Sequence, residues 1–289
     1  MSIVLTCGNL NKKYGPTYAL RNLDLQLEEN VIYGLLGRNG AGKTTLLNII
    51  AGGIFPDYGT IEVRGKKLGR GELPKDFCYV REKNKYFGGA RVVEILQYAA
   101  NFHPNWDWTL AHELLQTFQL DPHKKIRQLS RGTESIVGNI IGLASRAPLT
   151  LYDEPVLGLD VLMRERFYKS LLEDYANHPR TILLSTHLID EIAPVAEKVY
   201  IIEAGSLLLH DEMEQIRMAA YLIRGNSEAV ASFTAGKRVL HTETYGRGTL
   251  AAIYEKLDDG DKQQARELDI SIENLTLQKF FSYLIEGGH

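Results

Sequence analysis

The stretch that most constrains this chain is Val31–Ile50, VIYGLLGRNGAGKTTLLNII, where an apolar run gives way to glycines, a lysine and two threonines, and then to a second apolar run. This pattern predicts a buried strand, a loop and a helix. Gly37, Gly40 and Gly42 have access to backbone angles that a Cβ forbids, so the loop can turn its N–H groups inward and bind an anion at the start of the helix. The sequence therefore predicts a phosphate-binding loop.

The residues after these glycines provide chemistry for a triphosphate. Lys43 adds a positive charge for the β- and γ-phosphates, and the hydroxyl of Thr44 is placed to ligate a magnesium ion. A glycine-rich turn with an unrelated lysine is disfavoured, because the motif G-x-x-x-x-G-K-[ST] lies between a buried strand and a helix, as its mechanism requires. We therefore expect the chain to bind a nucleoside triphosphate. The predicted loop residues are Gly37, Arg38, Asn39, Gly40, Ala41, Gly42, Lys43, Thr44 and Thr45.

Composition disfavours several other classes of protein. The 289 residues hold 33 Lys and Arg against 36 Asp and Glu, which lacks the basic surface that nucleic-acid binding needs, so no nucleic-acid partner is expected. Two cysteines, Cys7 and Cys78, argue against a disulfide framework or a zinc site and fit a reducing compartment. No apolar stretch approaches the roughly 18 to 20 residues of a membrane span, and MSIVLTCGNL lacks the basic region and long apolar core of a signal peptide, so we expect a cytoplasmic location.

A second informative stretch is Pro148–Asp160, PLTLYDEPVLGLD, where a short apolar strand ends in Asp153 and Glu154. Beside a phosphate loop, the first of these acids holds the hydrated magnesium ion and the second polarises a water for attack on the γ-phosphate. Another apolar run, TILLS, leads directly to Thr186 and His187. Because the carboxyl ends of strands form the ligand-binding edge of an open α/β sheet, we expect His187 to contact the γ-phosphate.

The remainder of the first 213 residues predicts two additions to this core. Residues 3–10 and 18–27 alternate with period two and predict strands of a small antiparallel sheet, to which TIEVRGKKL adds another strand. Tyr14, between the first two strands, is either a half-buried edge residue or, beside a phosphate loop, an aromatic face that stacks on adenine. Residues about 83–145 change to helical spacing and predict a helical subdomain inserted between strands of the core.

From about residue 214 the hydrophobic pattern starts again. It predicts a small C-terminal α+β domain over residues 214–289, with loops at GNS and DDGDKQ and a terminal amphipathic helix. The predicted fold class is therefore α/β: a P-loop NTPase core with a parallel sheet over residues 1–213, a small antiparallel subdomain and a helical insert, followed by the accessory domain. The sequence leaves three roles open for the accessory domain: it braces a dimer, binds a regulator or caps the sheet.

With these residues in view, the chain resembles the ATP-binding subunits of ABC transporters over about residues 3–214. GRNGAGKTT resembles the Walker A motif of that family, and LTLYDEP resembles Walker B with Glu154 as the catalytic base. Asp160 matches the D-loop, His187 the switch histidine and Tyr14 the adenine-stacking aromatic residue. The resemblance implies an ATPase with ATP and Mg²⁺ as its nucleotide and metal.

The chain departs from the family pattern in two places. The signature peptide, usually LSGGQ, reads LSRGT here, so Ser130 and Gly132 are kept while Arg131 and Thr133 are substitutions. The resemblance implies that this peptide contacts the ATP bound by the opposite subunit. The position of the Q-loop glutamine is occupied by Glu82, a carboxylate that is also expected to ligate magnesium beside Thr44 and Asp153.

The resemblance also implies partners. Two ATP molecules would be enclosed between head-to-tail subunits, either two copies of this chain or a heterodimer, attached to transmembrane permease subunits on the inner face of the membrane. The chain carries three further segments of this resemblance: PNWDW, LDPHKKIRQLSRG and the C-terminal extension. They are most similar to bacterial single-cassette ATPases that pair with separate permease subunits, of the bacitracin-export, antimicrobial-peptide-resistance and gliding-motility types. The alternative is a soluble ABC-type ATPase that acts on ribosomes or DNA. A small-molecule P-loop kinase is a weaker hypothesis, because it leaves LSRGT and His187 unexplained.

Overall fold

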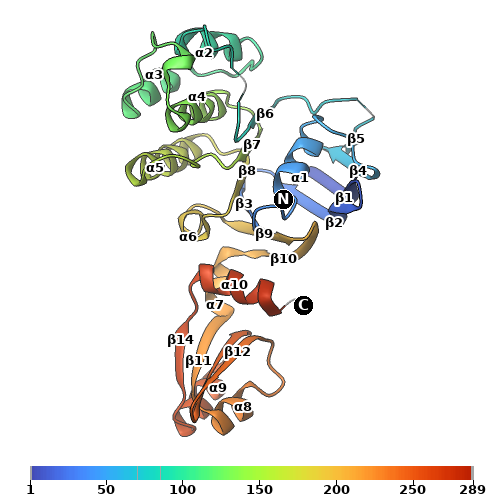
Figure 1. Cartoon of the computed structure of the whole chain (residues 1–289), viewed down its shortest axis with the longest axis vertical. Coiled ribbons are helices and arrows are strands. Elements are labelled where there is room, and N and C mark those ends of the chain that lie inside the picture. The colour runs from blue at the N-terminus through green and yellow to red at the C-terminus, as the bar shows by residue number, and fades with distance from the viewer. Residues whose placement is uncertain (1, 70, 85, 288–289) are drawn as a thin grey trace. The chain divides into compact units, whose positions relative to one another are not determined.

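The computed structural model describes residues 2–69, 71–84 and 86–287, and the chain divides into two compact units. Residues 1–187 and 202–207 form the first unit, and residues 188–201 and 208–289 form the second. Figure 1 shows their helices and strands in chain order, from blue to red. The predicted domain boundary at residue 213 stays a prediction.

The centre of the first unit is a parallel sheet built from four short apolar runs. In it β3 (Ile32–Leu36) pairs with β8 (Thr181–Thr186), β8 with β7 (Leu149–Asp153), and β7 with β6 (Phe77–Val80), all in parallel. Every residue of β3, β7 and β8 is buried, which explains why these segments read as continuous apolar runs. The parallel register brings the carboxyl ends of the four strands to one edge.

A second, antiparallel sheet of the first unit has the order β2-β1-β4-β5. The strands are β1 (Ile3–Tyr14), β2 (Thr17–Glu28), β4 (Tyr58–Val63) and β5 (Lys66–Lys67). Alternate residues of β2, from Leu23 to Leu27, are buried, so one face of this sheet is apolar. The small antiparallel subdomain is confirmed.

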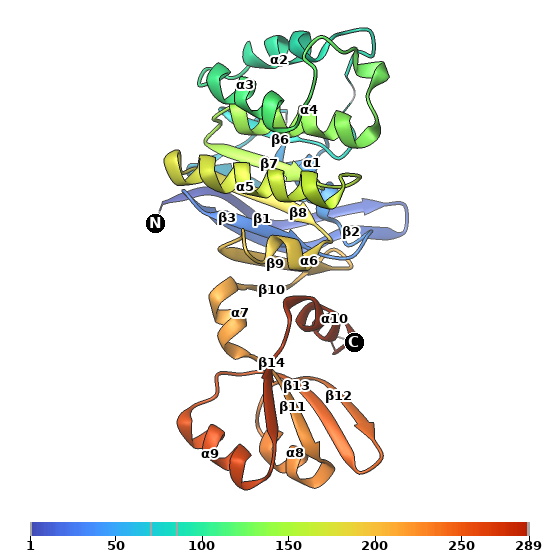
Figure 2. The same ribbon diagram turned by 90° about the vertical axis from the view of Figure 1, so that its left-hand side faces the viewer.

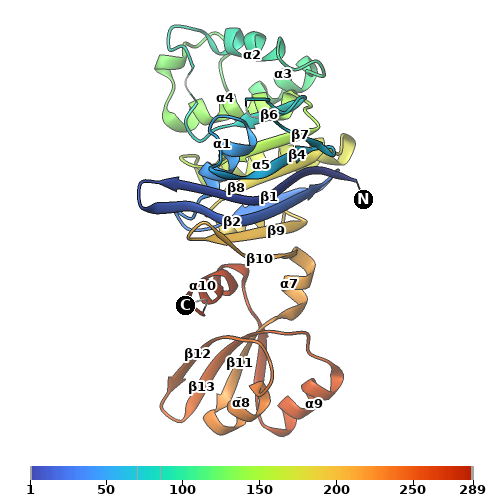
Figure 3. The ribbon, with the colours of Figure 1, turned by 90° about the vertical axis from the view of Figure 1, so that its right-hand side faces the viewer.

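Helices cover the parallel sheet on both faces. Helix α1 (Lys43–Ile50) contacts β2 and β7, so it lies between the two sheets, and Figure 3 shows it on that side. Helix α5 (Val161–Asn177) covers the opposite face, which is turned toward the viewer in Figure 2. The core is therefore a layered α/β arrangement in which helices cover the faces of the parallel sheet and not the edge formed by the carboxyl ends of its strands.

The helical insert follows β6 along the chain and packs beside it. It comprises α2 (Val92–Ala100), α3 (Trp108–Thr117), the short 3₁₀ helix η1 (Ile126–Gln128) and α4 (Arg131–Ala144). Helix α4 contacts α2, α3 and β6 and carries the buried apolar face. The insert predicted for about residues 83–145 is confirmed as helical. Of its aromatic residues, Phe102 is 67% exposed and Trp108 38% exposed.

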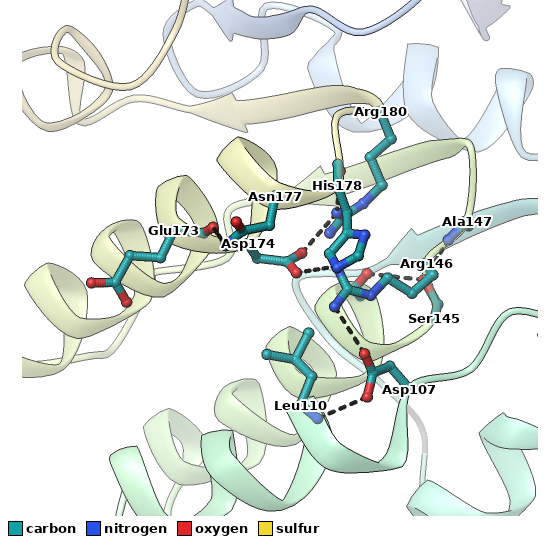
Figure 4. Close-up of polar contacts among 11 residues, drawn as sticks. Asp107, Leu110, Ser145, Arg146, Ala147, Glu173, Asp174, Asn177, His178 and Arg180 are labelled. Atoms are coloured by element: carbon teal, nitrogen blue, oxygen red, sulfur yellow. Dashed lines mark hydrogen bonds and ion pairs between the residues drawn. The ribbon is translucent and has the colours of Figure 1, made fainter.

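A polar network ties this insert to the core (Figure 4). Asp107 caps α3, accepting a hydrogen bond from the N–H of Leu110 at 2.9 Å, and it accepts another at 2.9 Å from Arg146, which follows α4. Arg146 also pairs with Asp174 of α5, whose other oxygen lies 2.7 Å from Arg180 Nη1. The Leu110 and Arg146 bonds lower the pKa of Asp107. These ion pairs thus connect the start of α3 and the end of α4 to α5 and to the segment before β8.

Asp174 is the member of this network that we expect to matter most for stability. Its side chain is 2% exposed and pairs with two arginines, so Asp174→Asn leaves buried positive charge without its counter-ion. We expect the free energy of unfolding to fall by about 3 to 5 kcal/mol, measured by chemical denaturation. The matched control is Glu173→Gln, which removes an exposed pair with Lys169 and should change stability by less than about 0.5 kcal/mol. Equal effects of the two variants would contradict this role of Asp174.

Between residues 188 and 208 the chain passes from the second unit to the first and back again. The short helix α6 (Ile189–Ile192) precedes β9 (Lys198–Glu203) and β10 (Ser206–Glu212). Ala204 and Gly205 join these strands and both have positive φ, as a two-residue hairpin turn requires. Helix α7 (Met213–Ala219) then leads into the C-terminal sheet.

That sheet has the order β12-β13-β11-β14, with neighbouring strands antiparallel. With α8 and α9, the chain order is β-α-β-β-α-β, the ferredoxin-like arrangement. An apolar cluster that includes Ile223, Phe233 and Ile253 lies between the sheet and these helices, and Phe280 of α10 packs against the ring of Tyr254. The bounds are β11 (Ala220–Asn226), α8 (Ser227–Thr234), β12 (Val239–Tyr245), β13 (Gly248–Tyr254), α9 (Asp259–Glu267), β14 (Ser271–Asn274) and α10 (Leu277–Gly287).

Two loop predictions in this domain were wrong. DDGDKQ begins α9, because Asp258 and Asp261 form a reciprocal capping box, each accepting the N–H of the other. GNS is not a loop either, since Asn226 ends β11 and its side chain caps α8 by accepting the N–H of Glu228 at 3.0 Å. In both cases polar residues that favour turns act as helix caps.

Candidate nucleotide-binding site

The phosphate loop joins β3 to α1 at the carboxyl edge of the parallel sheet. Gly40 and Gly42 have φ of +85° and +109°, in the region that favours glycine. A Cβ on Gly42 would lie 2.4 Å from the carbonyl oxygen of Ala19, and one on Gly37 would lie 2.6 Å from that of Ile202. Neighbouring backbone therefore leaves no room for a side chain at Gly37 or Gly42.

Substitution of Gly40 and of Gly42 distinguishes the effect of backbone strain from that of a steric collision, because both residues have positive φ but only Gly42 lies against neighbouring atoms. Gly40→Ala meets no atom within 4 Å, so it adds only left-handed backbone strain, about 1 to 2 kcal/mol. Gly42→Ala adds similar strain and also collides with Ala19, so we expect a clearly larger loss. Thermal unfolding of both variants without nucleotide measures the difference. A Gly42→Ala protein as stable as Gly40→Ala would show that the loop is not held by β2.

Lys43 is enclosed by the loop that it follows. It is 5% exposed, and its Nζ donates hydrogen bonds to the carbonyl oxygens of Gly37 at 2.7 Å and Arg38 at 3.3 Å. Glu154 Oε1 lies 3.6 Å from the same nitrogen. The ammonium group is thus held among oxygen atoms at the mouth of the loop, where a phosphate would find a positive charge already in place.

Asp153, the last residue of β7, has a carboxylate that lies beside three hydroxyl groups. Its Oδ1 accepts hydrogen bonds from Thr44 at 3.2 Å and Ser185 at 3.1 Å, and its Oδ2 lies 3.5 Å from the hydroxyl of Tyr79. Burial raises the pKa of Asp153, while the bonds from Thr44 and Ser185 oppose that shift. A carboxylate and a hydroxyl oxygen side by side suit a hard cation such as Mg²⁺.

The backbone of Glu154, the next residue, leaves the extended conformation of β7. Its φ is +50°, rare for a residue with a side chain, and its N–H donates to the carbonyl oxygen of Ser185 at 2.9 Å. Its Oε2 lies 2.9 Å from Nδ1 of His187, which follows β8. Strained backbone of this kind is common at functional sites, and here it directs the Glu154 side chain toward His187. The structure brings Lys43, Glu154 and His187 together, as the sequence indicated.

These residues border one cavity of about 420 Å³. Three other segments complete its wall: the rest of the phosphate loop, the end of β6 and the turn after Glu154. The lining residues are Arg38, Asn39, Gly40, Gly42, Lys43, Thr44, Thr45, Glu82, Glu154, Leu157 and His187. Among the described residues, no group of three or more His, Cys, Asp or Glu side chains gathers as a metal site.

Several predicted residues lie elsewhere. Tyr14 ends β1, is 53% exposed and is not part of the cavity wall in the described structure. Ala41 is buried beneath the loop and accepts a hydrogen bond from the N–H of Gly205 at 3.0 Å. Asp160 caps α5 by accepting the N–H of Met163 at 2.9 Å. The adenine-stacking role of Tyr14 and the D-loop role of Asp160 stay predictions.

The signature peptide forms the start of α4. Ser130 is its N-cap and accepts the N–H of Thr133 at 3.1 Å, with the Thr133 hydroxyl 2.8 Å away. Gly132 is held close to the turn after Glu154, since a Cβ there would lie 2.5 Å from the carbonyl oxygen of Gly158. Arg131 reaches back to Glu82 at 2.7 Å. None of residues 130–133 lines the cavity in the part of the chain that the structure describes.

Two residues of the site were not identified from the sequence. Ser185 and Tyr79 both place a hydroxyl group beside Asp153, and both come from neighbouring strands. Ser185 pairs in register with Asp153, but the order of the strands is not readable from either segment alone. The one available signal was the polar residue at the end of TILLS, next to a predicted ligand edge.

The fold and this cavity define a P-loop ATPase cassette with a helical insert. A family of known sequences described as ABC transporter matches residues 20–157. An uncharacterized ABC transporter ATP-binding protein of Methanocaldococcus jannaschii is 30% identical over 220 residues, covering 74% of this chain and 80% of that protein. The ABC transporter ATP-binding protein YtrB of Bacillus subtilis is 28% identical over 209 residues, 72% of each chain. The chain belongs to the family of ABC transporter ATP-binding proteins.

Further comparisons agree. The daunorubicin resistance ATP-binding protein DrrA3 of Streptomyces coeruleorubidus is 28% identical over 224 residues, 74% of this chain and 69% of that protein. A solved structure of an ATP-binding subunit of an ABC transporter has a TM-score of 0.65 at 25% identity, covering 74% of this chain and 92% of the other. The chain is thus an ATPase subunit of an ABC transporter. In the described part of the chain, no helix is both long and apolar enough to cross a bilayer.

Proposed function

We propose that the cavity binds MgATP and that Glu154 activates the water that hydrolyses it. The observation that carries this proposal is the convergence of Lys43, Glu154 and His187 on one cavity from three separate loops. Phosphoryl transfer asks little covalent chemistry of a protein, so positioned charges provide most of the catalysis. Lys43 neutralises phosphate charge, while His187 orients Glu154 and faces the γ-phosphate.

Thr44 and Asp153 are the residues that we expect to hold the magnesium ion. Their oxygens lie 3.2 Å apart, and Asp153 keeps a further oxygen toward Tyr79. When bound, the metal would offset the negative charge of the phosphates. Glu82 lines the same cavity and stays a predicted ligand, although its carboxylate is paired with Arg131 here.

We further propose that the working unit is a head-to-tail dimer in which Ser130 and Gly132 complete the site of the opposite chain. In support, the signature peptide begins an exposed helix end and lies outside the cavity of its own chain. Backbone N–H groups at the start of α4 favour a negatively charged ligand. The partner is a second copy or a related ATPase subunit.

The dimer in turn would drive transmembrane permease subunits at the inner face of the membrane, in the direction of export. The resemblance to single-cassette exporters supports this direction, and the name of the daunorubicin resistance protein fits it. ATP would hold the dimer closed, and hydrolysis would reopen it, which couples the nucleotide to motion of the insert. We assign the boundary between cassette and accessory domain to residue 213.

Glu154→Gln tests the catalytic assignment. The amide keeps the size of the side chain but cannot take a proton, so we expect ATP affinity within a few-fold of wild type and hydrolysis at least about 100-fold slower. With ATP the variant should elute as a dimer in size-exclusion chromatography. Lys43→Ala is the control, because it should lose nucleotide binding and therefore the dimer. Hydrolysis by Glu154→Gln at the wild-type rate would refute the role.

A complementation experiment tests the dimer. Ser130→Asp keeps a good N-cap for α4 but places negative charge where a γ-phosphate would lie. Ser130→Asp and Lys43→Ala should each be inactive alone. Mixed, they form heterodimers in which one site has an intact Lys43 and an intact Ser130, so ATP hydrolysis should reappear. A mixture as inactive as its components would contradict trans contact by the signature peptide.

A further inference from the structure

Two substitutions relative to the family pattern contact each other. Glu82 stands at the Q-loop position after β6, and Arg131 stands at the first glycine of the signature peptide, 49 residues later. Arg131 Nη2 donates to Glu82 Oε1 at 2.7 Å. The residues usual at these positions, a neutral glutamine and a glycine, would make no ion pair. The substitutions to Glu82 and Arg131 therefore introduce opposite charges that pair with each other.

The pair stands at the wall of the nucleotide cavity. Glu82 lines that cavity together with Glu154, and its negative charge contributes to the raised pKa of Asp153. On the other side, Glu82 and Arg131 line a neighbouring cavity of about 310 Å³ with Glu134. A triphosphate entering the first cavity therefore meets two carboxylates, Glu82 and Glu154. Repulsion from Glu82 would oppose its binding unless a cation stands beside that side chain.

We propose that Arg131 is a positioning residue that neutralises Glu82 and thereby allows the triphosphate to bind beside a carboxylate at the Q-loop position. Arg131 acts through Glu82 and not on the nucleotide of its own chain. The inference rests on the proposed function, because it assumes that the cavity takes ATP. It assigns a role within one chain to a residue of the signature peptide that the resemblance assigns only to the partner's ATP.

The exposure of the pair supports this electrostatic role over a structural one. The side chains of Arg131 and Glu82 are 61% and 30% exposed, and ion pairs at such positions contribute little to the stability of a fold. Their effect on the potential of the adjoining cavity remains, because the triphosphate carries several negative charges at short range. Salt should weaken the effect, since screening acts on partly exposed charges.

A double-mutant cycle tests the proposal. The variants are Arg131→Gly, Glu82→Gln and the double variant, with Arg131→Lys to restore the charge and Lys124→Ala as a control that removes a positive charge elsewhere on the insert. The readout is the Kd of a fluorescent ATP analogue, titrated with Mg²⁺ and again with EDTA, at low and high salt. Melting temperatures of the nucleotide-free proteins check that each variant folds.

We expect Arg131→Gly to weaken binding about tenfold in EDTA at low salt, and less at high salt. In the Glu82→Gln background, the same substitution should cost at most about twofold, so the double variant recovers most of the lost affinity. Arg131→Lys should restore most of it as well, and Lys124→Ala should have no effect. An Arg131→Gly penalty that is equal in the wild-type chain and in the Glu82→Gln background would overturn the proposal. If the wild-type chain binds no nucleotide, the proposed function itself fails, which is a different result.

Discussion

The buried carboxylate of Asp153 is the group on which the nucleotide site depends. It ends β7 and accepts hydrogen bonds from Thr44 of α1 and Ser185 of β8, so one side chain links the phosphate loop to two neighbouring strands. Burial raises the pKa of Asp153, and the hydrogen bonds from Thr44 and Ser185 oppose that shift. In the proposed function, the oxygen atom that joins these strands would also be a ligand of the magnesium ion.

The turn after Asp153 positions Glu154, the proposed catalytic base. Glu154 adopts φ of +50°, which sends consecutive acids in different directions: Asp153 into the interior and Glu154 into the cavity. A flat continuation of β7 would place the second side chain on the opposite face of the sheet. The carbonyl of Ser185 holds the turn, so β8 controls both acids and also places His187.

The helical insert is fixed to the core at two places of different character. At one, Asp107, Arg146 and Asp174 form a largely buried network whose loss is costly. At the other, Glu82 and Arg131 form an exposed pair beside the nucleotide cavity, which costs little to break. In the proposed ATPase cycle, the exposed pair beside the cavity would break more easily than the buried network, so the insert would move at the Glu82–Arg131 end.

The sequence by itself determined the phosphate loop, the paired acids and the helical insert, because each depends on neighbours in the chain: glycines before Lys43, an apolar run before Asp153, and helical spacing along α2 and α3. It also indicated that His187 lies at the ligand edge. Only the tertiary structure decided that Ser185 and Tyr79 face Asp153, and that Arg131 meets Glu82. Those contacts depend on strand order and on the path of the insert, which no local pattern encodes. In the accessory domain, the same polar residues act as turns or as helix caps, and only the backbone around Asp258 and Asn226 decides which.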